Sequence, residues 1–194
     1  YGCYVGVKAS GQEVASKTRS AGVMIDIEAR TSNGRVLVGG TRVDQRNLLN
    51  GTTDSSDVPL GGVVVGANGS GIEVYGNIIG LGRDGASDLG GGYGVVLKGS
   101  SNTVGGPSTS RNVISGNAYA QVWTKSENAI IANYLGTDAA GQVQSGISNG
   151  QGVKVYGSRN LIGGFSTGYG NIIKGASGAG VVVGGLVVAG GGVV

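Results

Sequence analysis

Three stretches of the chain share one pattern, which is a Gly pair, a short spacer, and an Asn followed by two apolar residues. The Gly pairs begin at Gly39, Gly105 and Gly163, and the corresponding Asn residues are Asn47, Asn112 and Asn171. Recurrence at about 60 residues is typical of an architecture in which successive units stack on one another. This repeat constrains the fold more strongly than any other feature of the sequence.

The composition favours short strands over other structures. Gly accounts for 43 of the 194 residues, but Pro occurs only twice and Gly has no period of three, so a collagen helix is excluded. Hydrophobic residues reach 39% and recur in short Val- and Ile-rich runs, which argues against disorder. Such runs, separated by Gly-rich turns, predict many short β-strands.

The order of these runs predicts coils of about 27–40 residues, each with three strand segments. The first segments are expected at residues 23–25, 63–65, 95–97, 122–124, 153–155 and 181–183. The second segments end at Val38, Val74, Val104, Ile130 and Ile162, and the third begin at Asn47, Asn77, Asn112, Asn133 and Asn171. Stacked coils of this kind form three parallel sheets around one apolar column, and the five Asn side chains are expected to form a ladder.

The fold class predicted is therefore all-β, a right-handed single-stranded parallel β-helix of about six coils. One domain is expected over 1–194, with a cap or lead-in at 1–21, coils at 22–183 and a C-terminal end of undefined structure at 184–194. Asn112-Val-Ile-Ser-Gly-Asn117, Asn160-Leu-Ile-Gly-Gly164 and Asn133-Tyr-Leu-Gly-Thr-Asp138 resemble the repeats of large secreted bacterial proteins. Over about residues 35–183 the chain is similar to the pectin-lyase-like right-handed β-helix superfamily.

The resemblance implies an extracellular or cell-surface protein, but it leaves the activity open. The superfamily includes polysaccharide lyases, glycoside hydrolases, epimerases, phage tailspikes and adhesin-like surface proteins, and a shared fold does not choose among them. Its glycosidases use clustered Asp residues, which makes the loop acids of this chain the weak candidates for catalysis. Asp84 and Asp88 share one loop, and Asp138 lies in the corresponding loop one repeat later.

These Asp residues have two interpretations, because a loop Asp either holds its turn through its side chain or belongs to a catalytic or Ca²⁺ cluster. Gly82-Arg-Asp-Gly partly resembles a Ca²⁺-binding glycine-rich motif, but that motif works in tandem copies and this one is single. We therefore expect no metal or other cofactor. Asp54 and Asp57 occupy a further loop. Arg111, which like Arg46 precedes a ladder Asn, is a candidate base or anion contact, with a solvated corner residue as the alternative.

An outward stripe on the first-segment strands is the most distinctive candidate for binding. Alternation along these strands places Val96, Trp123 and Lys154 on the outer face, followed by a column of Lys98, Lys125 and Tyr156. Aromatic faces stack on sugar rings and ammonium groups attract carboxylates or sulfates, so Trp123, Tyr156 and the three Lys residues are predicted to bind an acidic polysaccharide. The alternative is that Lys protects an open sheet while a neighbouring loop covers Trp123.

Charge and residue usage limit the other classes of function. The net charge is only +3 with no Lys/Arg block, so a nucleic-acid partner is not expected. No His is present, which removes His-based triads and His metal sites. Cys3 has no second Cys to pair with. The last 20 residues carry no charge, but Gly interrupts them repeatedly, so a membrane span is not expected.

The sequence thus favours an extracellular structural or adhesin-like module that binds a polysaccharide or surface glycan. Self-assembly, or continuation in a longer solenoid, is expected as well, because the open coil ends would expose unpaired strand edges. The alternative is a polysaccharide-active enzyme, namely a lyase, a glycoside hydrolase or an epimerase.

Overall fold

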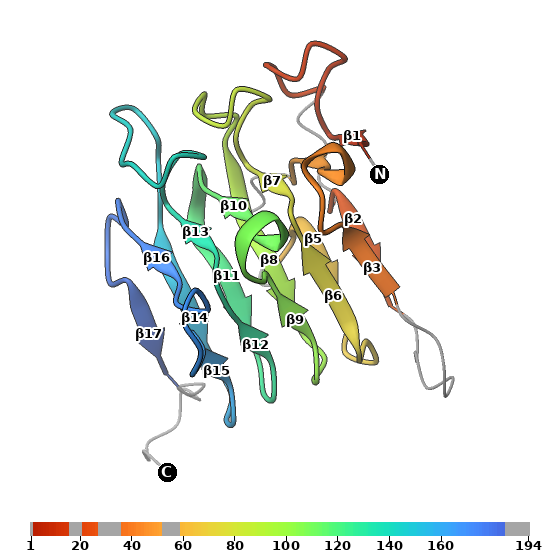
Figure 1. Cartoon of the computed structure of the whole chain (residues 1–194), viewed down its shortest axis with the longest axis vertical. Helices are drawn as coiled ribbons and strands as arrows, with labels where there is room; N and C mark the ends of the chain where they lie inside the picture. The colour runs from red at the N-terminus through yellow and green to blue at the C-terminus, as the bar shows by residue number, and fades with distance from the viewer. Residues whose placement is uncertain (1, 16–20, 27–35, 52–58, 185–194) are drawn as a thin grey trace, which may run out of the picture.

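The computed structural model describes residues 2–15, 21–26, 36–51 and 59–184. Asp54, Asp57 and most of the predicted C-terminal end lie outside these residues. The described strands form three sheets whose pairs are all parallel, as the sequence predicted for a β-helix of about six coils. In Figure 1 the coils follow one another from right to left as the colour runs from red to blue.

Each complete coil contributes one strand to each of the three sheets, which contain six, five and six strands among the described residues. Each sheet is named after one of its strands. The β8 sheet contains β2 (Val23–Ile25), β5 (Gly61–Val65), β8 (Gly91–Leu97), β11 (Asn117–Thr124), β14 (Gln151–Val155) and β17 (Val181–Val183). The β6 sheet contains β3 (Val36–Gly39), β6 (Ile72–Tyr75), β9 (Thr103–Val104), β12 (Ala129–Ile130) and β15 (Leu161–Ile162). The β7 sheet contains β1 (Tyr4–Val5), β4 (Leu48–Leu49), β7 (Ile78–Ile79), β10 (Val113–Ile114), β13 (Tyr134–Leu135) and β16 (Ile172–Ile173).

The length of a coil depends on the corner of the solenoid from which it is counted. Successive ladder Asn residues are separated by 30, 35, 21 and 38 positions, and Cys3 lies 44 positions before Asn47. Between paired residues of the first-segment strands the spacings are 40, 32, 27, 31 and 28 residues, which confirms the predicted range of 27–40 residues when coils are counted from those strands. The ladder spacings vary in the turns and loops, because the strands of the β7 sheet keep a constant register from coil to coil.

One apolar column fills the interior of the solenoid. Val95, Leu97, Val122, Val153, Ile114 and Ile130 are completely enclosed, and Val155 is 4% exposed, which confirms the predicted inward positions. Ile162 packs against the same core but is only half-buried. Its strand β15 is the last of the β6 sheet, so within the described residues it has a neighbouring coil on one side only.

The predicted Asn ladder is present over all five positions. The Nδ2 group of each Asn donates to Oδ1 of the next, at 3.0 Å from Asn47 to Asn77, 3.1 Å to Asn112, 2.9 Å to Asn133 and 3.1 Å to Asn171. Four of these Nδ2 groups also donate to carbonyl oxygens near the ends of strands of the β6 sheet, namely those of Asn77, Asn112, Asn133 and Asn171. Each side chain therefore ties two coils together and closes a corner.

A second Asn column, which the sequence analysis missed, occupies the corner between the β8 and β6 sheets. Asn102 Nδ2 donates to Asn128 Oδ1 at 3.1 Å, and Asn160 Oδ1 accepts the backbone N–H of Asn128 at 3.0 Å. Asn102 and Asn160 precede a Gly pair instead of following one, and Asn128 has no Gly pair beside it, so the repeat pattern did not reveal this column.

The ladder helps to explain the first glycine of two Gly pairs, Gly39 and Gly105. Gly39, Gly105 and Gly163 all have positive φ angles, of 92°, 83° and 90°. A Cβ atom on Gly39 would lie 2.5 Å from Asn77 Oδ1, and one on Gly105 would lie 2.1 Å from Asn133 Oδ1. Only Gly combines the left-handed turn with this close approach of the amide from the following coil.

Three long loops leave the β7 sheet after β1, β7 and β13 and stack on one another. The Arg83 amide donates to Gly11 O at 2.7 Å, and the Ala139 amide donates to Gly85 O at 3.0 Å. A second apolar cluster lies on the outer face of this sheet, and it includes Leu81 from the middle loop. The loops that carry the candidate Asp residues thus serve as a cover for one face of the solenoid.

Candidate glycan-binding face

The register of the β8 sheet brings the predicted binding residues into two adjacent columns. Trp123 pairs with Val96 on one side and with Lys154 on the other. Lys125 donates its backbone N–H to Leu97 O at 2.9 Å and Tyr156 donates to Thr124 O at 2.9 Å, so the register continues through the second column. The alternation of residues along these strands therefore predicted correctly that both columns lie on the outer face of the β8 sheet.

Trp123 does not present an open ring, which corrects the predicted stacking platform. Its exposed fraction is 9%, and it forms a small apolar cluster with the fully buried Val64 and Val96. The Tyr156 ring covers it at a centroid distance of 5.3 Å, tilted by 32°, and Tyr93 packs against the cluster. Lys98 and Lys154 are also half-buried where full exposure was expected, whereas Lys125 is exposed.

The accessible aromatic surface is supplied partly by residues that the sequence analysis missed. Between Asn117 and Ala120, β11 contains one more residue than the matching stretch of β8, which forms a β-bulge. The bulge projects Tyr119, whose side chain is 39% exposed and whose ring lies 5.3 Å from that of Tyr93 at 41°. Bulges commonly redirect a side chain in this way. No feature of the sequence predicted this bulge.

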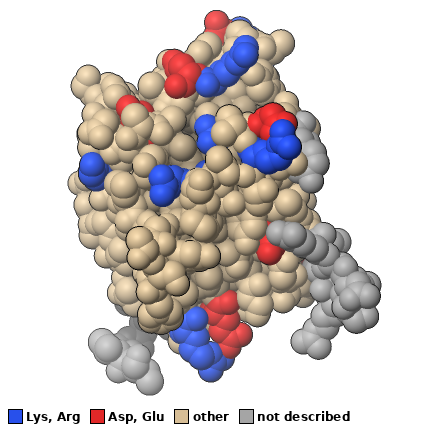
Figure 2. All heavy atoms as spheres, in the orientation of Figure 1, with Lys and Arg blue, Asp and Glu red and all other residues tan. Residues whose placement is uncertain are grey.

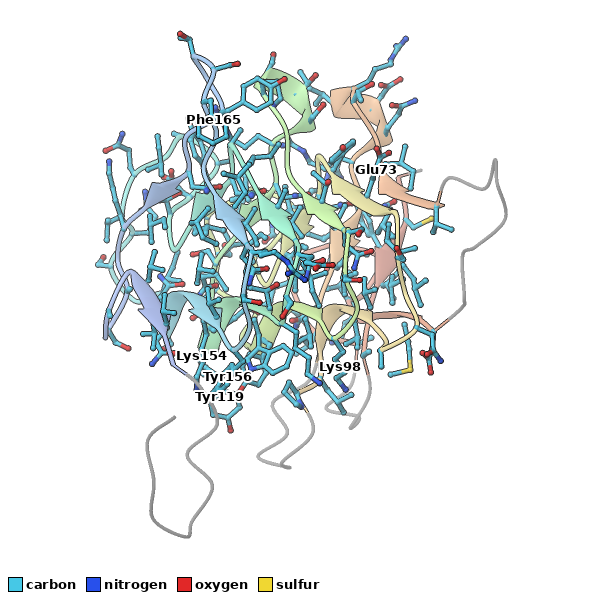
Figure 3. All side chains as sticks on the ribbon, turned by 90° about the horizontal axis from the view of Figure 1, so that it is seen from below. Glu73, Lys98, Tyr119, Lys154, Tyr156 and Phe165 are labelled. Carbon is cyan, nitrogen blue, oxygen red and sulfur yellow. The ribbon has the colours of Figure 1, made fainter. Side chains whose placement is uncertain are left out.

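Lys154 completes this aromatic group, which we call the aromatic–lysine face: Tyr93, Tyr119, Trp123, Lys125, Lys154 and Tyr156. Lys154 Nζ lies 5.2 Å from the centroid of the Tyr156 ring. Burial raises the pKa of Tyr93, the positive charge of Lys154 opposes that rise, and Tyr156 and Tyr119 add to it. Figure 3 shows Lys154, Tyr156 and Tyr119 together along one edge of the molecule, with Lys98 farther along the same edge.

The candidate catalytic acids hold their own loops. Asp84 Oδ1 accepts the backbone N–H groups of Ala86 at 3.0 Å and Ser87 at 2.9 Å. Partial burial opposes ionisation of Asp84, but the hydrogen bonds from Ser87 and Ala86 outweigh it and lower the pKa of this carboxyl. A carboxyl that stays ionised in this way is poorly suited to act as a general acid near neutral pH.

Asp138 and Asp88 have comparable roles in their loops. Asp138 Oδ1 accepts N–H groups from Ala140 at 2.9 Å and Gln142 at 2.8 Å, and the bond from Gln142 is the largest cause of a lowered pKa. Asp88 joins two loops, because its Oδ2 accepts the backbone N–H of Ser148 at 2.9 Å, 60 positions away. Among the described residues, no three His, Cys, Asp or Glu side chains are grouped so that they could hold a metal ion.

Arg111 forms part of a corner between the β6 and β7 sheets. Its Nε donates to Ala132 O at 2.9 Å, and its guanidinium carbon lies 4.2 Å from the centroid of the Tyr134 ring. Arg46, at the matching position two coils earlier, donates Nε to Gly76 O at 3.0 Å, and burial lowers its pKa from the usual high value. Arg stays protonated in proteins, so this environment favours a corner or anion contact over a base.

The surface charges of the solenoid are dispersed. Figure 2 shows Lys and Arg in small separate groups on one face, several of them beside Asp or Glu. Three ion pairs among the described residues are Lys8 with Glu13, Arg42 with Asp44, and Arg159 with Glu127. In the described ranges, no helix is both long enough and apolar enough to span a membrane.

Comparison of the chain with protein-family models, with curated proteins and with solved structures gives no match.

Proposed function

We propose that the chain is an extracellular structural module of the adhesin-like type that binds an acidic polysaccharide on its aromatic–lysine face. We further propose that it is a member of the pectin-lyase-like superfamily. The repeat, the three parallel sheets and the Asn ladder support that assignment, and the location at the cell surface follows from it.

The observation that carries the binding proposal is the partly exposed arrangement of Tyr119, Tyr156 and Lys154 with the exposed Lys125. Tyr rings combine an apolar face with a polar edge, which suits them to the mixed surface of a sugar. They are anchored on a sheet by Tyr93 and the buried Trp123, so little side-chain freedom is lost when a ligand binds. Trp123 acts in this proposal as a support for Tyr156.

A structural role is favoured over polysaccharide cleavage by what the candidate acids do. Asp84 and Asp138 each accept two backbone N–H groups in their own turns, and Asp88 accepts one from a neighbouring loop. A glycosidase needs two carboxyl groups placed on either side of a scissile bond, one of them with a raised pKa. Hydrogen bonds within their loops instead lower the pKa of Asp84 and of Asp138.

The test is a titration of the protein with polygalacturonate, alginate and heparin, with neutral dextran as the control polymer. Tyr119→Ala is expected to weaken binding at every salt concentration. The double change Lys125→Gln with Lys154→Gln should weaken it mainly at low salt, because exposed charges are screened beyond about 8 Å at physiological ionic strength. Ala118→Ser, on the same bulge, is the matched control.

The same reactions are assayed for new reducing ends and unsaturated sugars. Binding without product supports the structural role, whereas product formation that survives repurification of the protein would favour the enzyme. If none of the acidic polymers binds, or if Tyr119→Ala and the Lys double variant bind like the unchanged protein, the aromatic–lysine face is not the glycan site.

A further inference from the structure

Arg46 and Arg111 occupy one column of the solenoid, at the residue that precedes each ladder Asn. The column continues through Gly76 and Ala132, which precede Asn77 and Asn133. The two arginines are two coils apart, which corresponds to roughly 9.6 Å at the usual spacing of about 4.8 Å between strands. The two-coil spacing thus places the two arginines in one row along the axis, with one coil between them.

Each arginine is fixed by the same contact. Arg46 Nε donates to the carbonyl of Gly76, and Arg111 Nε donates to the carbonyl of Ala132, in each case in the following coil. Gly76 and Ala132 both have positive φ angles, of 67° and 53°, and present little or no side chain at the corner. The coil next to each arginine therefore leaves room for the guanidinium group and orients it.

Both charges lack a carboxylate partner among the described residues, although both side chains are half-buried. The Nε bond is the only hydrogen bond that the side chain of either arginine donates to those residues. Arg42 and Arg159, by contrast, are neutralised by Asp44 and Glu127. Arg111 also lies on the Tyr134 ring, a stacked geometry that leaves the outer edge of the guanidinium free to bind an anion.

We propose that Arg46 and Arg111 form a second binding row that holds anionic groups of a linear acidic polysaccharide. The inference rests on the proposed function and adds a contact at the corner between the β6 and β7 sheets, away from the outer face of the β8 sheet. Two fixed cations separated by about 10 Å fit a polymer with sparse, regular charges. Double-stranded DNA carries one charge per about 1.7 Å, and it would call for a denser basic surface than a chain of net charge +3 provides.

The first experiment compares the double variant Arg46→Gln with Arg111→Gln against the single variant Arg159→Gln. Arg159 is the matched control, because it precedes Asn160 of the second Asn column but is paired with Glu127. The probes are polygalacturonate and heparin at low and high salt, with circular dichroism and a melting curve to establish that each variant is folded. We expect the double variant to lose roughly tenfold or more in affinity at low salt, since charge-assisted hydrogen bonds are lost, and the control to change less than twofold.

The second experiment uses the unchanged protein, so that it does not depend on how a variant folds. A diketone that modifies guanidinium groups is applied with and without each probe, and the modified residues are located by mass spectrometry. Arg46 and Arg111 should be protected by the acidic polysaccharides, with Arg159 unprotected. Equal modification with and without probe, or protection by DNA alone, would overturn the proposal.

The outcomes for the two surfaces are separable. If Tyr119→Ala and the Lys double variant weaken binding while Arg46 and Arg111 are neither required nor protected, the second row is wrong and the proposed function stands. If the arginines are required and the aromatic–lysine face is not, the arginine row stands and the aromatic–lysine face is not the glycan site. If no acidic polysaccharide binds, both fail.

Discussion

Asn77 and Asn112 lie 35 positions apart in the chain, yet Asn77 donates to Asn112 Oδ1 through both its side-chain Nδ2, at 3.1 Å, and its backbone N–H, at 2.9 Å. One oxygen therefore satisfies two donors of the preceding coil. Asn112 Nδ2 donates in turn to Val74 O at 2.7 Å and to Asn133 Oδ1 at 2.9 Å. This arrangement makes the ladder a set of crosslinks between coils rather than a row of independent turn caps.

Replacing Asn112 by Ala should therefore destabilise the protein. The change leaves the Asn77 donors and the acceptors on Val74 and Asn133 without this partner inside the structure, and unpaired buried groups cost about 1–3 kcal/mol each. We expect the free energy of unfolding in urea to fall by at least about 2 kcal/mol. Asn68→Ala, at an exposed turn residue, is the control and should change it by less than about 0.5 kcal/mol.

The contact between Gly105 and the ladder predicts that Gly105→Ala and Gly146→Ala differ in stability. Gly105→Ala adds a Cβ in a left-handed conformation and also forces it within 2.1 Å of Asn133 Oδ1. Gly146→Ala adds only the strained conformation, because its φ is 88° and no atom lies within 4 Å of the new Cβ.

The conformation alone costs about 1–2 kcal/mol, so Gly146→Ala should lower stability by that amount and Gly105→Ala by clearly more. Thermal and urea unfolding of the two variants measure the difference. Equal losses would show that the ladder amide does not approach the Gly pair.

The lowered pKa of Asp138 predicts how the stability of the protein depends on pH. The folded protein lowers the pKa of this carboxyl, chiefly through the Gln142 amide, so the unfolded chain takes up the proton first as pH falls. Its stabilising contribution is therefore present above the unfolded pKa of about 3.9 and is lost as pH falls through the lower folded value. The stability difference between the unchanged protein and Asp138→Asn should shrink below about pH 4. A difference that stays constant from pH 6 to pH 2.5 would contradict this.

Much of the fold could be predicted because the Asn positions and the alternating strands repeat along the sequence. Asn47, Asn112 and Asn171 follow a Gly pair, and Val95 and Leu97 point inward for the same reason as Val122 and Val153. The column of Asn102, Asn128 and Asn160 was missed, because none of these residues follows a Gly pair. The 21-residue coil from Asn112 to Asn133 shows that a turn between strands can be shorter than the neighbouring coils suggest.

The candidate site was harder to predict, because it depends on contacts between coils. Alternation placed Trp123 on the outer face but could not show that Tyr156 and Tyr93 cover it. The bulge that projects Tyr119 arises from a mismatch in strand length between β8 and β11, which neither strand reveals alone. The burial of Lys98 and Lys154 depends likewise on neighbours from other coils.

The stacking register underlies both proposed binding surfaces and the ladder, and disulfide formation between outward positions of the β6 sheet tests it most directly. Thr103 pairs with Ala129, and Ala129 pairs with Leu161. In a Cys3→Ser background, T103C with A129C and A129C with L161C should each close an intramolecular disulfide, since adjacent strands lie about 4.8 Å apart and bridged Cα atoms are usually 4.4–6.8 Å apart. T103C with L161C, two coils apart, should remain reduced under the same conditions. A disulfide between T103C and L161C, or no disulfide in either adjacent pair of the folded protein, would contradict the register and with it the ladder and both proposed binding surfaces.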